Sequence, residues 1–246
     1  MNDFMEMHWG YHIWEQAASE LLTQVGKPFL DEIDFVIHKS STQALVLASC
    51  LSRHGDVLSQ WRAYGQDGAG FAIGFRATAL INLAIKPLQV EYNRDKQCAE
   101  IMQFISAIYD LEKTEPVPRG ADFLKSCANL AFDLAAFKNP AFSEESEIRL
   151  IHLLNFKKSN ASLRLVDSGG TAFNKPFDSQ PINFHMVRST PVAHIDLDFT
   201  DNGCINPICE VVLGPKNESL PSNISVFLET LDINNVNVRQ SSASYR

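Results

Sequence analysis

The stretch "WRAYGQDGAGFAIGF", from Trp61 to Phe75, decides how the fold is interpreted. Two aromatic residues and an arginine stand within four positions, and an apolar run interrupted by glycines follows. Loops that bind dinucleotides or phosphates place their glycines after a strand and at the start of a helix. Here the glycines precede a strand, and neither G-x-G-x-x-G nor Gly-Lys-Ser/Thr occurs. We therefore expect a turn over Gly65 to Gly70 that leads into a strand ending at Phe75.

Two side chains of this stretch are open to two interpretations. Trp61 and Tyr64 are three residues apart, so on a helical turn they share one face. They either pack in a core or form the aromatic wall of a pocket in which Arg62 contacts an anion. Gly74, inside the expected strand, indicates a bulge or a close neighbour.

The rest of the chain mixes helical and strand patterns without a regular alternation. Apolar spacing predicts helices over 4–26, 28–39, 96–111, 121–137 and 222–232, the last capped by Ser222. Short apolar or alternating runs predict a buried strand at 44–51 and further strands at 70–75, 87–92, 147–154, 163–166, 182–187, 191–199, 209–214 and 235–241. We predict an α+β fold, one domain over residues 1–246, with a mixed or antiparallel central sheet flanked by helices.

The composition of the chain argues against several classes of protein. The 246 residues are 45% hydrophobic and carry a net charge of −8, which argues against a broad nucleic-acid surface. The chain has no apolar run long enough for a transmembrane helix, and its start lacks the basic segment of a secretory signal. Five scattered cysteines without a CxxC favour reduced thiols, and we expect a cytoplasmic protein.

The second informative stretch is "FSEESEIRLIHLL". If a strand runs from Glu145 to Leu153, Glu145, Glu147 and Arg149 lie on one face, with the two carboxylates roughly 7 Å apart. Such carboxylates can divide roles, one stabilising a positively charged sugar centre and the other positioning a nucleophile. The alternative is a solvated strand face on which Arg149 pairs with the acids.

Other catalytic and metal patterns are weak. His8 and His12 share a helix face, but two ligands do not make a metal site, and Trp9 and Tyr11 beside them suggest ordinary packing. We predict no metal site. The E-S-E sequence lacks the lysine of a nuclease motif, and no G-x-S-x-G occurs.

Several ordered motifs resemble domain-of-unknown-function family 2971 (DUF2971), a widespread bacterial family. The run from Leu51 to Phe75 is similar to its signature L-S-x-x-x-D-x-L-x-Q-W-x-x-Y-G-x-x-x-x-G-F-x-I-G-F. "NDFMEMHWGY", "KNPAFSEESEIRL", "EVVLGPKN" and the closing "VRQSSASYR" resemble its other segments. Members usually carry about two dozen residues before N-D-x-x-E, so we expect this chain to be a version shortened at the N-terminus or one with a late start codon.

The family layout is in turn similar to that of ADP-ribosyltransferases. This resemblance implies NAD as the cofactor, Glu147 as the catalytic carboxylate and Glu145 as the residue that orients the acceptor. It also implies that Ser49 or Ser52 lines the nicotinamide pocket together with Trp61 and Tyr64. Arg62 and Arg149 are further residues that we expect to bind the cofactor. A carboxylate would stabilise an oxocarbenium-like centre as nicotinamide leaves. The acceptor would be a protein or a small molecule.

A second class of function fits the same residues. In a non-catalytic binding or regulatory module, such as one of a defence or toxin system, Arg149 would bridge the acids and Arg62 would stack on Trp61. The variant Glu147→Gln distinguishes the enzyme from the binding module. Losing a buried pairing partner lowers the free energy of unfolding, whereas losing a catalytic residue need not lower it.

Overall fold

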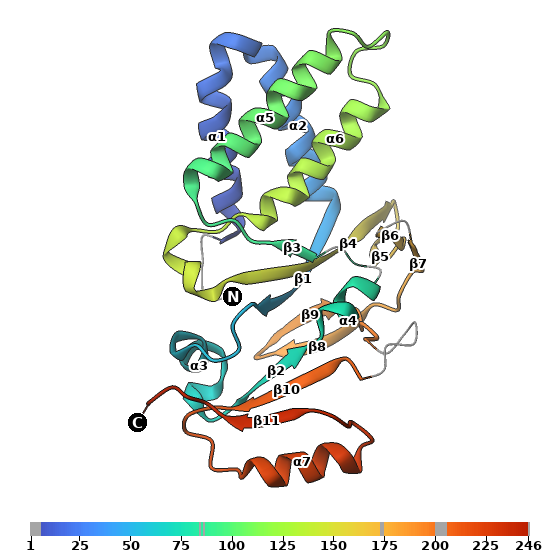
Figure 1. Cartoon of the computed structure of the whole chain (residues 1–246). Helices are drawn as coiled ribbons and strands as arrows, with labels where there is room; N and C mark the ends of the chain where they lie inside the picture. Colours follow the sequence, from blue (N-terminus) through green and yellow to red (C-terminus); the bar gives the residue numbers. More distant parts are fainter. Residues whose placement is uncertain (1–5, 84, 86, 173–174, 200–205, 246) are drawn as a thin grey trace. The chain divides into compact units, whose positions relative to one another are not determined.

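The computed structural model describes all residues except 1–5, 84, 86, 173–174, 200–205 and 246 (Figure 1). It contains helices together with antiparallel and mixed sheets, which confirms the α+β class. The chain forms two compact units, each assembled from separated segments. Unit 1 comprises Met1–Ser49, Leu88–Ser143 and Ile151–Ser168, and unit 2 comprises Cys50–Pro87, Glu144–Leu150 and Gly169–Arg246. The assignment of 1–246 to a single domain stays a prediction.

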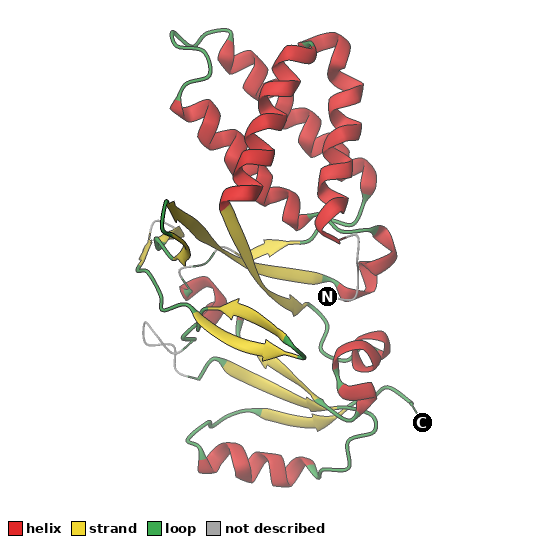
Figure 2. Ribbon diagram, turned by 180° about the vertical axis from the view of Figure 1, so that it is seen from behind, coloured by secondary structure: helices red, strands yellow, loops and turns green. Residues whose placement is uncertain are grey.

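Four helices dominate unit 1, and Figure 2 shows them as a bundle: α1 (Glu6–Val25), α2 (Lys27–Gln43), α5 (Arg94–Glu112) and α6 (Ala121–Asp133). Helix α1 buries an apolar stripe at helical spacing, made of Ile13, Trp14, Ala17, Leu21 and Val25. This stripe packs with buried side chains of the other three helices in one core. None of the described helices is both long and apolar enough to cross a membrane.

Neighbouring residues explain where helices α2 and α5 begin. Pro28 lies in the first turn of α2, where its missing N–H costs nothing, and Gly26 before it has a φ of 83°. Helix α5 is capped by Asn93, whose side chain accepts a hydrogen bond of 3.0 Å from the backbone N–H of Lys96.

One sheet has the order β1-β4-β3, and β5 pairs with β4. Its strands are β1 (Ala44–Ser52), β3 (Pro87–Gln89), β4 (Glu147–Ser159) and β5 (Ser162–Val166). The prediction of a strand at 44–51 is confirmed, but its burial was wrong, because no residue of β1 is buried. The strand predicted over 87–92 is shorter, since β3 ends at Gln89 and the chain turns into α5.

Unit 2 contains the mixed sheet β11-β10-β2, made of β2 (Phe71–Phe75), β10 (Ile208–Leu213) and β11 (Asn237–Gln240). Strand β10 is antiparallel to β2 and parallel to β11. Helix α7 (Pro221–Thr230) connects β10 to β11 and lies beside β11 (Figure 1). The cap assigned to Ser222 was wrong, because Pro221 opens α7 and Leu220 is its N-cap residue.

The remaining elements of unit 2 are short. They are α3 (Leu58–Tyr64), α4 (Ala77–Asn82) and two antiparallel hairpins, β6 (Gly170–Ala172) with β7 (Lys175–Phe177) and β8 (Asn183–Val187) with β9 (Thr190–His194). The strands predicted at 182–187 and 191–199 form the second hairpin, although β9 ends at His194. Short 3₁₀ turns cover Gln66–Gly68, Leu134–Ala136 and Pro140–Glu145.

Candidate functional site

The glycine-rich stretch forms the predicted turn. Helix α3 ends at Tyr64, Gly65 is its C-cap residue, and the amide of Gly70 donates back to the Gly65 carbonyl at 2.8 Å. Between them Gln66, Asp67 and Gly68 all have positive φ, and Gly68 has a φ of 90°. A Cβ at Gly70 would lie 2.9 Å from the Gly65 oxygen, so only glycine fits there. The turn leads directly into β2, as expected.

The turn is fastened to the chain segment that follows β10. The amide of Gly214 donates to Gly70 at 3.0 Å, and the amide of Lys216 donates to Gly68 at 2.8 Å. Gly74, in β2, faces Glu210 across a pairing register that shifts between Ile208 and Glu210. A Cβ at Gly74 would lie 3.1 Å from that of Glu210, which confirms the close neighbour predicted at this glycine.

A group that we call the Asp56 cluster (Asp56, Trp61, Arg239, Ser241 and Ser242) joins α3 and the residue before its N-cap to β11 and the chain that follows it. Asp56 accepts hydrogen bonds from the indole N–H of Trp61 at 2.8 Å and from the backbone N–H and hydroxyl of Ser242 at 2.7 and 2.9 Å. The hydroxyl of Ser241 donates a further short bond. Arg239 lies 3.3 Å from the same carboxylate and 2.9 Å from that of Glu210.

These donors determine the ionisation of Asp56, whose side chain is 12% exposed. Burial alone would raise its pKa, but the hydrogen bonds from Ser241, Trp61 and Ser242 outweigh burial and hold the pKa well below its usual range. Asp56 is therefore a largely but not fully buried carboxylate that is held in its charged form. Its role is to fix the segment after β11 onto α3.

The second set of contacts involves Tyr245. Its hydroxyl donates to Asp67 at 2.6 Å, and the Lys216 ammonium lies 2.9 Å from the same carboxylate. Lys216 Nζ is also 3.9 Å from the centre of the Tyr245 ring, and the guanidinium of Arg62 is 5.8 Å from it. Arg62 thus contacts Tyr245, whereas stacking on Trp61 had been expected.

Trp61 and Tyr64 have different surroundings although both belong to α3. Trp61 is 3% exposed and packs as a core residue, with its N–H on Asp56. Tyr64 is 55% exposed, and its hydroxyl donates to Glu145 Oε1 at 3.1 Å. Ser52 donates to the backbone carbonyl of Glu145 at 2.8 Å. The structure thus brings three of the predicted site residues together: Ser52, Tyr64 and Glu145.

The strand predicted at 147–154 is present in β4, but the strand considered from Glu145 to Leu153 was wrong at its start. Glu145 ends a 3₁₀ turn, Ser146 has a φ of 43°, and β4 begins only at Glu147. Because this positive φ interrupts the extended backbone, Glu145 and Glu147 do not follow the alternation of a single strand. Ser59 donates to Glu144 at 2.8 Å, so the acids before β4 are contacted from α3.

Glu147 and Arg149 form a buried ion pair. Arg149 Nε lies 3.0 Å from Glu147 Oε1, and Arg149 Nη2 lies 3.1 Å from Oε2. Both side chains are 7% exposed. This two-bond geometry is the strongest form of a carboxylate–guanidinium contact. The solvated strand face that had been considered was wrong, because both residues are buried, but the pairing with Arg149 is present.

Sequence reasoning missed the residues that hold this region together: Asp56, Asp67, Lys216, Arg239, Ser241, Ser242 and Tyr245. A signal did exist. Asp56 stands in the first motif of the family resemblance, and Ser241 and Tyr245 stand in its closing segment. Nothing in the sequence indicated that the two motifs meet, because such a contact joins residues far apart in the chain.

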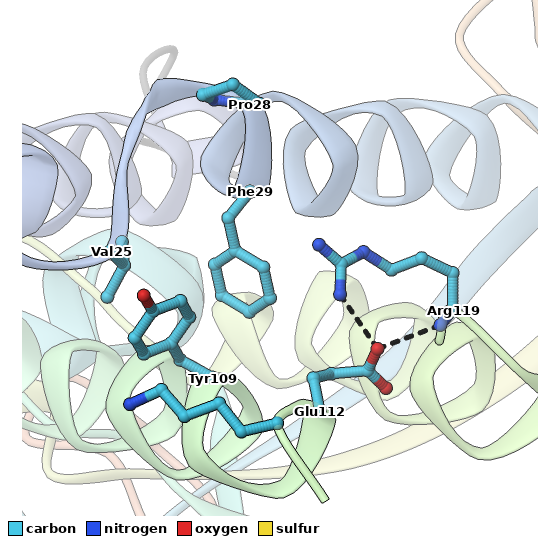
Figure 3. A pocket seen from close by; sticks show the side chains of 7 residues that line it. Val25, Pro28, Phe29, Tyr109, Glu112 and Arg119 are labelled. Atoms are coloured by element: carbon cyan, nitrogen blue, oxygen red, sulfur yellow. Dashed lines mark hydrogen bonds and ion pairs between the residues drawn. The ribbon is translucent and has the colours of Figure 1, made fainter. Parts of the chain in front are cut away.

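Unit 1 contains a separate shallow pocket of about 290 Å³ (Figure 3). Arg119 dominates it, with its guanidinium 4.7 Å from the Phe29 ring. The backbone N–H and Nη1 of Arg119 each donate to Glu112 at 2.8 Å, and its Nε contacts Glu32. Since this arginine is already neutralised, the pocket offers no unpaired charge at Arg119 for a ligand. None of the predicted site residues lines it.

Two further classes of site find little support. No group of three or more His, Cys, Asp or Glu able to hold a metal ion occurs among the described residues. Cys127 is fully buried, and burial raises the pKa of its thiol to about 12, so this thiol is hardly ionised near neutral pH.

A known protein family matches the part of the chain that contains most of the predicted site residues. Residues 60–150 match the family DUF2971, a protein family of unknown function. The match supports the resemblance carried by the motifs, and it contains Trp61, Arg62, Tyr64, Glu145, Glu147 and Arg149. No curated protein and no solved structure matches the chain.

Proposed function

We propose that unit 2 is a non-catalytic binding module and that Glu147 is part of its framework. The observation that carries this proposal is the buried, two-bond pair of Glu147 with Arg149. A catalytic carboxylate has to contact the reacting atoms, whereas both oxygens of Glu147 face a guanidinium and its side chain is 7% exposed. Losing this pair would remove a doubly hydrogen-bonded carboxylate from a buried guanidinium, which should lower the free energy of unfolding by about 1.5–3 kcal/mol.

The binding surface in this proposal is the acidic surface, defined by Tyr64, Glu144 and Glu145. Glu144 is exposed, Glu145 is half-buried, and Tyr64 is 55% exposed. Tyrosine is enriched among the residues that dominate binding energy, and two neighbouring carboxylates attract cationic groups. The net charge of −8 acts in the same direction over longer distances. We therefore assign a basic protein segment as the partner class.

Three of the cysteines fit a reducing compartment. Cys98, Cys127 and Cys209 are thiols, and the first two are buried. This state agrees with a cytoplasmic location, which belongs to the same proposal.

One observation favours a second candidate, an ADP-ribosyltransferase-like enzyme that consumes NAD. The hydroxyl of Tyr64 contacts the half-buried carboxylate of Glu145, and Ser52 contacts the same residue. These residues were expected beside nicotinamide and acceptor. In this version Glu145, rather than the buried Glu147, would be the carboxylate that meets the substrate.

Labelled NAD⁺ separates the two candidates. The folded protein is incubated with labelled NAD⁺ and a cell lysate, beside the variants Glu145→Gln and Glu147→Gln. The binding module predicts no transferred label from any of them, and it predicts that Glu147→Gln alone is strongly destabilised. Label that appears with the wild type and disappears with Glu145→Gln would overturn the module in favour of the enzyme.

The partner class has its own measurement. A fluorescent lysine-rich peptide is titrated by anisotropy at low and high salt. Glu144→Gln combined with Glu145→Gln should weaken binding at least fivefold, and Glu229→Gln, an exposed acid on α7, should not. Equal binding by both variants would exclude the acidic surface as the docking site.

A further inference from the structure

The hairpin β8–β9 in unit 2 brings together two histidines that are nine residues apart in sequence. His185 pairs with Val192 and His194 pairs with Asn183, so the two histidines are diagonal neighbours on one face. Their Nδ1 atoms are 3.0 Å apart, and their ring centres are 4.8 Å apart. His185 is exposed and His194 is partly exposed, so both rings are within reach of solvent.

We propose that His185 and His194 form an open binding site for a transition-metal ion that prefers imidazole ligands, such as Zn²⁺, Cu²⁺ or Ni²⁺. Two imidazole nitrogens on one tetrahedral Zn²⁺, each about 2.0–2.1 Å from the metal, would be about 3.3 Å apart. The observed 3.0 Å lies within a few tenths of an ångström of that separation. Small rotations of the exposed His185 ring and the partly exposed His194 ring therefore suffice.

Metal binding requires the hydrogen between the two Nδ1 atoms to move to another ring nitrogen. In the neutral pair one Nδ1 carries a hydrogen and donates it to the other. When both Nδ1 atoms bind a metal, each neutral ring carries its hydrogen on Nε2 instead. Binding to the neutral pair thus shifts one hydrogen from Nδ1 to Nε2 of the same ring, with no net release of protons.

The surroundings of His194 suit this second tautomer. Asp196 Oδ1 lies 3.9 Å from His194 Nε2, on the side of the ring away from His185. The amide of Asn183 donates to the other oxygen of Asp196 at 3.1 Å and holds the carboxylate in place. Metal-binding histidines commonly direct their second ring nitrogen toward a carboxylate, which orients the ring and strengthens it as a ligand.

The site supplies two protein ligands, and the remaining positions on the metal would be taken by water. The described residues contain no group of three or more ligands, so the proposed site is of the weak, exchangeable kind and is not a resident metal centre. A two-ligand site binds a metal reversibly rather than as a permanent structural ion.

Isothermal titration of the whole protein with ZnCl₂ tests the proposal. One Zn²⁺ should bind per chain, and His185→Ala and His194→Ala should each weaken binding at least tenfold. Asp196→Asn should weaken it about tenfold, as expected for loss of a group that orients a ligand. His12→Ala is the matched control, because this exposed histidine of α1 lies near Glu15 and should leave the affinity unchanged.

A second readout keeps the test independent of folding. With Cu²⁺, electron paramagnetic resonance should show two coordinated nitrogens in the wild type and one in either single histidine variant. Circular dichroism establishes that the variants remain folded. The proposal is overturned if the wild type binds no Zn²⁺ at millimolar metal, or if binding persists in the double variant. It is equally overturned if His12→Ala is the variant that loses binding.

Discussion

The helical core of unit 1 and the Asp56 cluster of unit 2 are stabilised by different interactions. In unit 1, nineteen buried residues form one continuous apolar cluster across α1, α2, α5 and α6 and the short turn after α6. In unit 2, Asp56 binds Trp61, Arg239, Ser241 and Ser242, and Glu147 binds Arg149. Apolar burial tolerates substitutions that conserve volume, whereas a buried charge depends on the particular groups that pair with it. The two regions should therefore respond differently to mutation and to pH.

The largest single effect is expected in the apolar core. Ile105→Ala removes a side chain with no exposed surface and should lower the free energy of unfolding by about 2–5 kcal/mol, through lost burial and the cavity left behind. Urea denaturation measures the loss, and hydrogen exchange shows whether α5 is affected. Ile105→Val, which removes one methyl group, should cost only about 0.5–1.5 kcal/mol. A loss below 1 kcal/mol for Ile105→Ala would contradict the described core.

The Asp56 cluster should give the next largest effect. Asp56→Asn keeps the shape of the side chain but removes the charge that accepts from Ser241, Ser242 and Trp61, and it leaves Arg239 with one acidic partner fewer. We expect a loss of about 3 kcal/mol by urea denaturation. Hydrogen exchange should increase at 239–245. Asp178→Asn, at an exposed position, is the control and should be neutral within about 0.5 kcal/mol.

The same carboxylate predicts a pH dependence. Its folded-state pKa is depressed, so its contribution to stability is complete above its unfolded pKa of about 3.9 and is lost as the pH falls toward the folded value. The difference in unfolding free energy between wild type and Asp56→Asn should shrink steadily below about pH 4. A difference that stays constant from pH 7 to pH 2.5 would show that Asp56 is not held in its charged form.

The smallest effect is expected at the surface. Lys27 and Asp31 lie 2.7 Å apart on α2, but their side chains are 73% and 59% exposed. Lys27→Ala should therefore change stability by no more than about 0.5 kcal/mol, and the change should vanish in high salt. If Lys27→Ala lowered the free energy of unfolding as much as Asp56→Asn, the expected difference between exposed and largely buried charge pairs would be contradicted.

Local patterns predicted most of the elements and little of the site. The helices of unit 1 follow from apolar spacing, and the glycine turn follows from residues that tolerate positive φ. The error at Glu145 has a local cause, because the alternation of side chains could not indicate that Ser146 adopts a φ of 43°. Ser146 is not a residue type that marks such a turn.

The contacts that the sequence could not provide are all long-range. Asp56 and Ser242 are 186 residues apart, and Tyr245 and Asp67 are 178 residues apart. The burial of Glu147 and Arg149 was also hidden, because an acid and a base two residues apart in a strand are equally typical of a solvated face. Which face is buried depends on residues elsewhere in the chain.

A double-mutant cycle on Glu147 and Arg149 tests the central claim most directly. The unfolding free energies of Glu147→Gln, Arg149→Met and the double variant are compared with that of the wild type. We predict that each single change costs about 1.5–3 kcal/mol and that the double variant is less destabilised than the sum by at least about 1 kcal/mol, because the interaction between the two side chains is lost only once. Single variants near wild-type stability, with additive effects, would contradict a framework role for Glu147 and return it to the candidates for catalysis.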